Sequence, residues 1–395
     1  MNSTVTASRL SRLASRVEPF HVMRLLEQAA GLAAQGRSII HMEVGEPDFP
    51  TAGPILEAGR QALAEGRTRY TPARGLPALR DALTGYYAGR YDTAVDPARI
   101  LITPGASGAL QLVFQSVLEP GDGVLICDPS YPCYRQVLRL MGVEPIAVPV
   151  GPETDYQLTV ALAAAAWRPA VRALIVASPS NPTGSSIAPE VLSGLYALCR
   201  ARGAALIVDE IYQGLTYEAP DRTALALGAG DLYCINSFSK YFGMTGWRLG
   251  WLVGPADTVA VMERLAQNLF IAANTPAQYA ALAALAPATR ETLEVRRDAF
   301  RQRRDRLLPA LRALGFGIPV QPTGAFYLYA RLPAGVGLDS MAFAERMLVE
   351  AGVALTPGHD FGHYEADRHV RFAYTSESAD LDEGVRRLRD ALARL

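Results

Sequence analysis

Seven short apolar runs alternate with helical stretches between residues 96 and 254, and this pattern constrains the fold most. The runs are rich in valine, isoleucine and leucine, as expected of strands that are buried on both faces. Such strands, separated by helices, are typical of a mostly parallel sheet in an α/β layer structure. The sequence therefore predicts an α/β domain with a mostly parallel seven-stranded sheet, its strands lying in residues 100–105, 123–129, 145–150, 172–179, 205–212, 232–239 and 248–254.

The pattern changes near residue 290. An arginine-rich helical stretch (292–314) precedes shorter apolar runs, further helical segments and a final charged helix, in the order expected of a smaller α+β domain. We therefore expect three parts: an N-terminal arm (1–45) that packs with the small domain, a large domain (46–288) and a small C-terminal domain (289–395).

Composition excludes several classes of function. The 395 residues carry a formal net charge of −1, so the chain lacks the basic surface that binds nucleic acid or anionic membranes. Half of the residues are hydrophobic, but no apolar run approaches the roughly 18 residues of a membrane-spanning helix. We expect small-molecule partners or a second copy of the chain.

Cysteine and histidine spacing gives no sign of a disulfide framework or a metal site. Four cysteines form no CxxC pair, which favours a reducing, cytoplasmic compartment. His359 and His363 are four residues apart, but Pro357 and Gly358 precede them and no glutamate follows the first, so no metal site is expected. The first 17 residues contain three arginines and no acid, which fits either an organelle transit peptide or, as we prefer, a polar terminal arm.

Lys240 is the only lysine in the chain, since 37 of the 38 basic residues are arginine. An amine forms a Schiff base with a carbonyl, which a guanidinium cannot do. The alternative is a surface lysine left over in an arginine-rich chain. Ser237, Ser239 and Arg248 surround Lys240 in the sequence, and hydroxyls with a guanidinium suit a phosphate. Together these residues indicate a phosphorylated aldehyde bound to Lys240.

The segment SFSKYFGMTGWRLG (237–250) resembles the active-site segment of the fold type I pyridoxal-phosphate aminotransferases of class I/II, the aspartate aminotransferase superfamily. The resemblance covers about residues 18–390 and implies pyridoxal 5'-phosphate (PLP) held in the large domain. Further motifs of this family occur in the expected order: EVGEPDFPT (43–51), RYTPARGLPALRDAL (69–83), TPGASGALQL (103–112), SPSNPTG (178–184), VDEIY (208–212), GAFYLY (324–329), TPGHDFG (356–362) and HVRFAYTSES (369–378).

The resemblance implies a role for each residue around the cofactor ring. Lys240 would hold PLP as an internal aldimine and later move the substrate proton. Asp209 would keep the pyridine nitrogen protonated, so that the ring serves as an electron sink. Tyr212 and Asn181 would hydrogen-bond the O3′ oxygen, and Tyr131 would stack on the ring. Without this context, Asp209 could simply cap a helix, and Tyr212 could be a core tyrosine.

The phosphate group is expected where a strand passes into a helix, because free N–H groups and the helix dipole attract anions there. TPGASGAL offers such a junction, in which Gly105 and Ala106 supply N–H groups and Ser107 a hydroxyl. A Gly/Ser turn alone is weak evidence. Ser237 and Arg248 complete the predicted cradle, and by resemblance Tyr70 reaches into it from the other subunit of a homodimer.

Substrate binding is predicted less completely. Arg371 matches the arginine that grips the substrate α-carboxylate, with Gly45 and Asn181 beside it. A dicarboxylate substrate would need a second cation, for which Arg74 is one candidate among many. Alternatively, an apolar or aromatic pocket could be lined by Phe20, Tyr131 and Phe326.

The sequence thus predicts an aminotransferase that moves an amino group between an L-amino acid and a 2-oxo acid by a ping-pong cycle. Glutamate with 2-oxoglutarate is the usual half of the substrate pair in this family. Two alternatives remain open. One is a C–S lyase or an aminocyclopropane-carboxylate synthase on the same scaffold. The other is a transcription regulator, although the EVGEPDF motif begins too early for the DNA-binding module of about 60 residues that such proteins carry.

Overall fold

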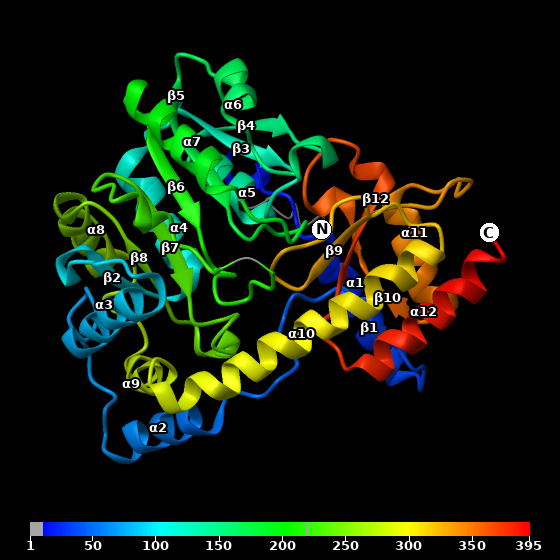
Figure 1. Ribbon diagram of the computed structural model, residues 1–395, viewed down its shortest axis with the longest axis horizontal. Helices are drawn as coiled ribbons and strands as arrows, with labels where there is room; N and C mark the ends of the chain where they lie inside the picture. Colours follow the sequence, from blue (N-terminus) through cyan, green and yellow to red (C-terminus); the bar gives the residue numbers. More distant parts are fainter. Residues whose placement is uncertain (1–10, 219) are drawn as a thin grey trace, which may run out of the picture.

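A computed structural model describes residues 11–218 and 220–395 of the chain. The transit-peptide alternative concerned the first 17 residues, and residues 1–10 lie outside the described part. A large domain around a central sheet and a smaller domain lie side by side, and the long helix α10 (Pro287–Ala313) runs from one to the other (Figure 1).

The central sheet has seven strands in the order β2-β8-β7-β6-β5-β3-β4. Only β8 is antiparallel to its neighbours, and the other pairings are parallel. The predicted mostly parallel seven-stranded sheet is therefore confirmed, and each predicted run contributes one strand. The strands are β2 (Ile100–Thr103), β3 (Gly123–Asp128), β4 (Glu144–Pro149), β5 (Val171–Ala177), β6 (Ala205–Asp209), β7 (Tyr233–Ser237) and β8 (Gly250–Val253).

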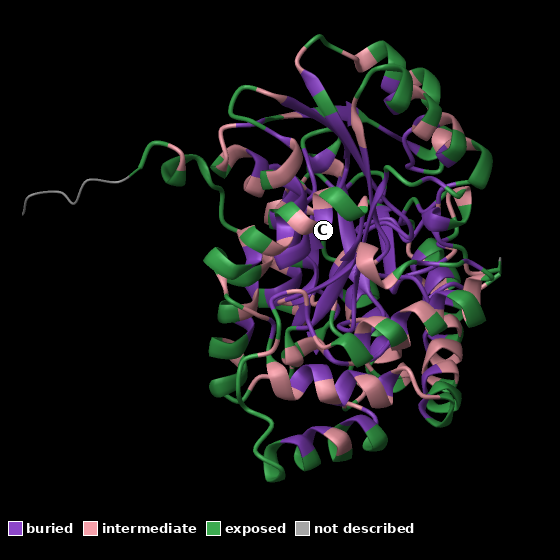
Figure 2. Cartoon of the chain, turned by 90° about the vertical axis from the view of Figure 1, so that its left-hand side faces the viewer, coloured by how far each residue is buried: buried purple, intermediate pink, exposed green. Residues whose placement is uncertain are grey.

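Helices cover both faces of this sheet, which is why most of its strands are apolar on both sides. Alternate strand residues enter different cores: Leu206 and Val208 pack on one face, and Ile207 on the other. Buried residues accordingly concentrate in the sheet and on the inner sides of the helices (Figure 2). The helices that accompany the sheet are α2 (Gly53–Ala64), α3 (Pro77–Tyr91), α4 (Gly105–Val117), α5 (Pro132–Leu140), α6 (Val160–Ala166), α7 (Pro189–Ala201), α8 (Ala256–Leu269) and α9 (Thr275–Ala284).

The smaller domain contains a three-stranded antiparallel sheet, β11-β12-β9. The N-terminal segment joins this domain, because β1 pairs in parallel with β10, and α1 contacts β10 and β11. The predicted domain boundaries remain proposals. The elements are α1 (His21–Ala34), β1 (Ile40–His41), β9 (Tyr327–Arg331), α11 (Ser340–Arg346), β10 (Val353–Ala354), β11 (Thr356–Pro357), β12 (His369–Ala373) and α12 (Ser378–Leu392).

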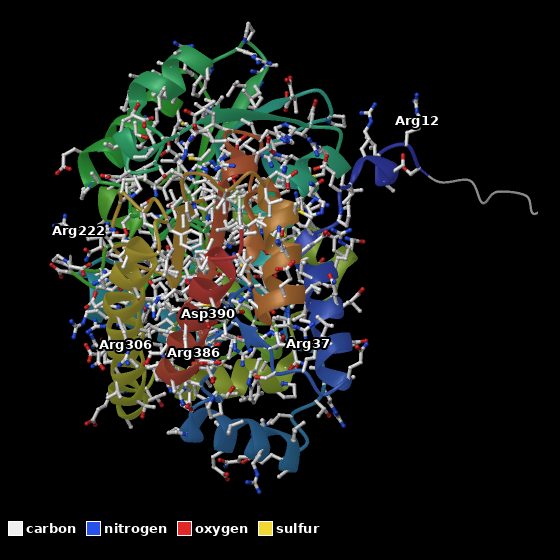
Figure 3. The ribbon with its side chains drawn as sticks, turned by 90° about the vertical axis from the view of Figure 1, so that its right-hand side faces the viewer. Arg12, Arg37, Arg222, Arg306, Arg386 and Asp390 are labelled. Atoms are coloured by element: carbon white, nitrogen blue, oxygen red, sulfur yellow. The ribbon has the colours of Figure 1, made fainter. Side chains whose placement is uncertain are left out.

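Arginine side chains form the ion pairs on the protein surface. Arg306 on α10 pairs with Asp382, and Arg386 on α12 pairs with Asp390 one helical turn away. Arg306, Arg386 and Asp390 lie on the outer side of the two helices (Figure 3), where each exposed ion pair contributes little to stability. Within residues 11–218 and 220–395, no helix is both long and apolar enough to cross a bilayer.

Candidate active site

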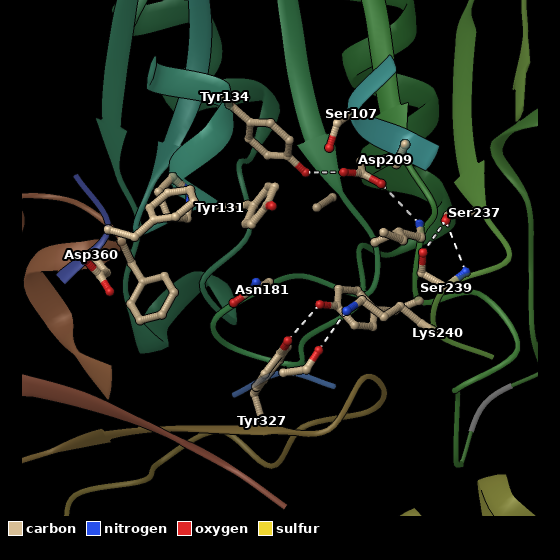
Figure 4. A pocket seen from close by; sticks show the side chains of 18 of the residues that line it. Ser107, Tyr131, Tyr134, Asn181, Asp209, Ser237, Ser239, Lys240, Tyr327 and Asp360 are labelled. Atoms are coloured by element: carbon tan, nitrogen blue, oxygen red, sulfur yellow. Dashed lines mark hydrogen bonds between the residues drawn. The ribbon is translucent and has the colours of Figure 1, made fainter. Parts of the chain in front are cut away.

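One pocket of about 240 Å³ collects most of the predicted site residues (Figure 4). It lies where β6 and β7 end and the chain turns into loops and helices, the usual ligand position in open α/β sheets. Gly105 and Tyr70 do not line it. The predicted residues that do are Gly45, Ala106, Ser107, Tyr131, Asn181, Asp209, Tyr212, Ser237, Lys240, Arg248 and Arg371.

Lys240 enters the pocket from the loop that follows β7. Its Nζ donates a hydrogen bond to the carbonyl oxygen of Gly45 at 2.7 Å. Burial lowers the pKa of Lys240 to about 8, with Arg371 and Arg248 acting in the same direction and Glu46 opposing them. A lower pKa leaves more of the amine unprotonated near neutral pH, and the unprotonated amine is the form that attacks a carbonyl.

Asp209 is the last residue of β6 and is buried in the pocket wall. Its Oδ1 accepts from the backbone N–H of Ile211 at 3.1 Å, and its Oδ2 accepts from the hydroxyl of Tyr134. Burial raises the pKa of Asp209 to about 6, although both hydrogen bonds oppose this rise. A desolvated carboxylate of this kind stabilises a cationic nitrogen placed next to it.

The first turn of α4 provides one side of an anion cradle. Gly105 has a φ of +69°, and a Cβ on it would lie 2.7 Å from Nη2 of Arg248. A Cβ on Gly250 would lie 2.7 Å from the carbonyl carbon of Gly105 and 2.9 Å from the nitrogen of Ala106. Glycine at both positions therefore lets β8, the Arg248 guanidinium and the helix N-terminus come together.

Hydroxyl groups complete the cradle. Ser237, the last residue of β7, donates to the carbonyl oxygen of Leu249 at 3.0 Å, and the Oγ atoms of Ser237 and Ser239 lie 2.9 Å apart. Ser107 is exposed on the first turn of α4. Hydroxyls, a guanidinium and free helix N–H groups together form a suitable site for a phosphate.

Arg371 projects from β12 into the opposite wall and is buried. It donates to Oδ1 of Asn181 at 2.9 Å, to Oγ1 of Thr356 at 3.2 Å and to the carbonyl oxygen of Glu43. Its guanidinium lies 4.2 Å from the ring centroid of Tyr327, and its Nε has no hydrogen-bond partner. The Arg371 guanidinium is therefore held in place, and its buried Nε–H remains available to a further acceptor.

Two site tyrosines had no role in the sequence prediction. The hydroxyls of Tyr327 and Tyr212 lie 2.8 Å apart, and a Cβ on Gly45 would lie 1.8 Å from the Tyr327 oxygen. Tyr134 contacts Asp209 as described above. The available signals were weak: Tyr327 lies within the GAFYLY motif, and Tyr134 follows Tyr131 by three residues, which places both on one side of a helix start.

Two of the candidates that the sequence offered for the substrate end do not line the pocket. Arg74 does not line the pocket, because it forms an ion pair with Glu263 at 2.8 Å. Phe326 is 0% exposed and does not line it either, since its ring packs against Tyr212 and Phe300 at centroid distances of 5.4 Å. Arg74 is thus paired with Glu263, and Phe326 belongs to the hydrophobic core.

The geometry fits pyridoxal phosphate. An amine with a lowered pKa, an anion cradle that added Cβ atoms would fill, and a buried carboxylate all face one cavity. When bound, this cofactor supplies an electron sink for the bonds at the substrate Cα. The fold and the site thus define a PLP-dependent enzyme of fold type I.

Comparison with known proteins identifies the family. The model for aminotransferases of class I and II matches residues 37–388, so the chain belongs to that family. The chain is 35% identical to a valine–pyruvate aminotransferase of Mycobacterium tuberculosis, with 95% of this chain and 97% of that protein covered. It is also 35% identical to an aspartate/prephenate aminotransferase of Thermus thermophilus, with coverages of 98% and 99%.

Solved structures agree. The crystal structure of an aminotransferase from M. tuberculosis matches with a TM-score of 0.94 at 35% identity, covering 98% of this chain and all of that one. The aspartate aminotransferase of T. thermophilus with maleate matches with a TM-score of 0.92 at 35% identity, covering 97% and 100%. The predicted fold, PLP dependence and aminotransferase activity are therefore confirmed.

Proposed function

We propose that Lys240 carries the reaction of this aminotransferase, first by binding the cofactor aldehyde and then by moving the proton between the substrate Cα and the cofactor. One observation carries this assignment: the Nζ of Lys240 is desolvated, has a lowered pKa and faces the pocket between Gly45 and the anion cradle. No other lysine exists in the chain. An amine that alternates between free and protonated forms near neutral pH suits proton transfer.

The polar groups around Lys240 are assigned to the ring of the cofactor. Asp209 would hold the proton on the pyridine nitrogen, supported by the hydrogen bond from Tyr134. Asn181 presents its oxygen to Arg371, which leaves its NH₂ group to donate to the ring oxygen together with the Tyr212 hydroxyl. Tyr131 supplies an aromatic face on the pocket wall.

The two ends of the pocket are assigned to two anions. Gly105, Ala106, Ser107, Ser237 and Arg248 would bind the phosphate. Arg371 would bind the substrate α-carboxylate, with Asn181 and the Gly45 segment beside it. Because both anions are gripped at fixed positions, the substrate Cα is held near Lys240 in one orientation.

Replacement of Lys240 by arginine tests the assignment. Lys240→Arg keeps the positive charge, but a guanidinium cannot form a Schiff base with the cofactor aldehyde. We therefore expect this variant to lose both the visible absorbance of the bound cofactor and turnover. Arg306→Lys makes the reverse exchange in an exposed ion pair on α10 and should leave both unchanged. Turnover by Lys240→Arg at the wild-type rate would overturn the assignment.

A second experiment, an assay of the wild-type enzyme, separates transamination from the lyase alternative. With a wild-type enzyme, an aminotransferase converts a 2-oxo acid to an amino acid in proportion to donor consumed. A C–S lyase instead releases ammonia and a 2-oxo acid without an acceptor. We propose the first outcome, supported by the aminotransferase names of the full-length relatives.

We further propose a homodimer in which Tyr70 contributes to the phosphate site of the partner subunit. Tyr70 is 81% exposed and does not line the pocket of its own chain. Exposed leucines, Leu56 and Leu63, lie on α2, just before the Tyr70 segment. An exposed tyrosine beside exposed apolar side chains is typical of a subunit interface.

A cytoplasmic location is also proposed. All four cysteines are free, and three of them are buried. Free thiols suit a reducing compartment. Fractionation of cells that express the chain, with antibody detection, would test this.

A further inference from the structure

Asp360 marks the end of the pocket that lies away from the anion cradle. In the pocket, it is on the opposite side from Ser237 and Ser239, with Tyr131 between them (Figure 4). Asp360 is 6% exposed, and it follows β11 in the small domain. None of the roles assigned above uses it.

Both carboxylate oxygens of Asp360 are occupied by the start of α1. Oδ1 accepts from the backbone N–H of His21 at 2.7 Å, and Oδ2 accepts from that of Val22 at 2.9 Å. Burial raises the pKa of Asp360, whereas these two hydrogen bonds act against the rise. The N-terminal end of the helix also favours the ionised form.

This anchoring places apolar side chains over the pocket. Phe20 and Val22, on either side of the anchored His21 N–H group, both line the cavity. Phe361, the residue after Asp360, lines it as well, and its ring centroid is 4.9 Å from the Arg371 guanidinium. A substrate whose α-carboxylate is bound by Arg371 therefore has its side chain close to this apolar wall.

Within one chain, the charged residues that line the pocket do not offer a partner for a second carboxylate. Among the lining residues, the cations are Lys240, Arg248 and Arg371, and each already has a task in the proposed function. Asp209 would hold the proton on the cofactor nitrogen. The remaining charge is Asp360, which would repel a distal carboxylate in a desolvated site.

We propose that this end of the pocket, formed by Phe20, Val22, Asp360 and Phe361, is a subsite for apolar side chains that rejects acidic ones. The enzyme then takes amino acids with apolar side chains as donors and monocarboxylic 2-oxo acids as acceptors. The proposal rests on the proposed function, because it assumes that Arg371 binds the α-carboxylate.

Donor half-reactions of the wild-type holoenzyme test the specificity directly. The change in cofactor absorbance is followed after mixing with leucine, phenylalanine, aspartate or arginine. Leucine and phenylalanine should react at least about 100-fold faster than aspartate, as expected when a buried like charge opposes binding. In the reverse half-reaction, pyruvate should likewise react faster than 2-oxoglutarate.

Each outcome is decisive. Aspartate reacting as fast as leucine, or arginine reacting fastest, would overturn the apolar subsite while leaving the aminotransferase function intact. If no donor changed the absorbance of a cofactor-loaded enzyme, the proposed function would fail, and the subsite with it.

Asp360→Asn tests whether the carboxylate itself is the repulsive element. The variant removes the charge at nearly constant volume, so the ratio of the aspartate rate to the leucine rate should rise at least about tenfold. Asp339→Asn is the matched control, because Asp339 also accepts from a helix N-terminal N–H, that of Ala342 at 2.8 Å, and does not line the pocket. An unchanged ratio in Asp360→Asn, including a parallel loss with both donors, would overturn this role of Asp360.

Discussion

The Nζ of Lys240 lies 2.7 Å from the carbonyl oxygen of Gly45, a residue 195 positions earlier in the chain. Lys240 follows a strand of the large sheet, whereas Gly45 follows β1, which pairs with the small domain. The hydrogen bond of Lys240 therefore joins the large domain to the segment that packs with the small domain. The environment of Lys240, and hence its pKa, depends on the contact between them.

The half-buried Lys240 is expected to destabilise the cofactor-free protein below about pH 8. Its pKa falls from 10.5 in the unfolded chain to about 8 in the fold, so the folded protein binds fewer protons between these values. Stability should consequently rise with pH across this window. The shift corresponds to a cost on the order of 3 kcal/mol when the lysine is charged.

Urea unfolding of the cofactor-free protein measures this effect. Lys240→Met removes the charge and keeps an unbranched chain, so it should exceed the wild type in stability at pH 7 and approach it at pH 10. A stability difference that does not change with pH would contradict the lowered pKa of Lys240.

Arg371→Lys should impair substrate binding more than cofactor binding. Lysine keeps the charge but loses the planar fork, which is held by Asn181 and Thr356. We expect kcat/KM for the amino donor to fall about 100-fold, equivalent to about 2.7 kcal/mol, because a bidentate contact with a carboxylate is lost. The visible cofactor absorbance should stay unchanged. Steady-state kinetics at varied donor concentration would measure the fall in kcat/KM, and an absorbance spectrum would measure the bound cofactor, with Arg306→Lys as the control for both.

Gly45→Ala should abolish activity for a steric reason. The added Cβ would lie 1.8 Å from the hydroxyl oxygen of Tyr327, so the segment that accepts the Lys240 hydrogen bond must move. Gly31→Ala is the control: Gly31 lies within α1, and apart from its chain neighbours and its own helix backbone no atom lies within 4 Å of the added Cβ. This variant should stabilise the protein by about 0.5–1 kcal/mol. Equal activities of the two variants would be inconsistent with the close approach at Gly45.

Hybrid dimers test the proposed role of Tyr70. Subunits with Lys240→Ala and subunits with Tyr70→Ala are each expected to be nearly inactive as homodimers. Mixed in equal amounts, they should recover about a quarter of the wild-type activity, because half of the dimers are hybrids and each hybrid has one intact site. If Tyr70 acted within its own chain, mixing would restore nothing.

The sequence predicted the sheet well because burial on both faces leaves a continuous apolar pattern in most of its strands. Lys240 was found because a lone lysine among arginines is visible in composition. Tyr134 and Asp360 were missed for the opposite reason. Their contacts join residues 75 and 339 positions apart, and no local pattern records which tyrosine reaches Asp209 or which acid anchors α1.

Arginine was too abundant for single assignments at the substrate end. Arg74 was a reasonable candidate for a distal cation, but its ion pair with Glu263 depends on how α8 packs beside the chain near residue 74. From the sequence, Phe326 could not be distinguished from a residue that lines the pocket, because aromatic residues of the core and of the pocket occur in the same apolar pattern. Such choices depend on tertiary packing, which a single sequence does not reveal.

The pairing of β1 with β10 also affects the order in which the chain can fold during its synthesis. The backbone N–H of Met42 bonds the carbonyl of Ala354, so this edge waits for about 310 further residues to leave the ribosome. At about 5–20 residues per second, the N-terminal segment stays without its partner for roughly 15–60 s, and β8, the last strand of the large sheet, is synthesised about 100 residues before that partner. The apolar side of α1, with Leu25 and Ala29, therefore lacks its contacts with β10 and β11 throughout that interval.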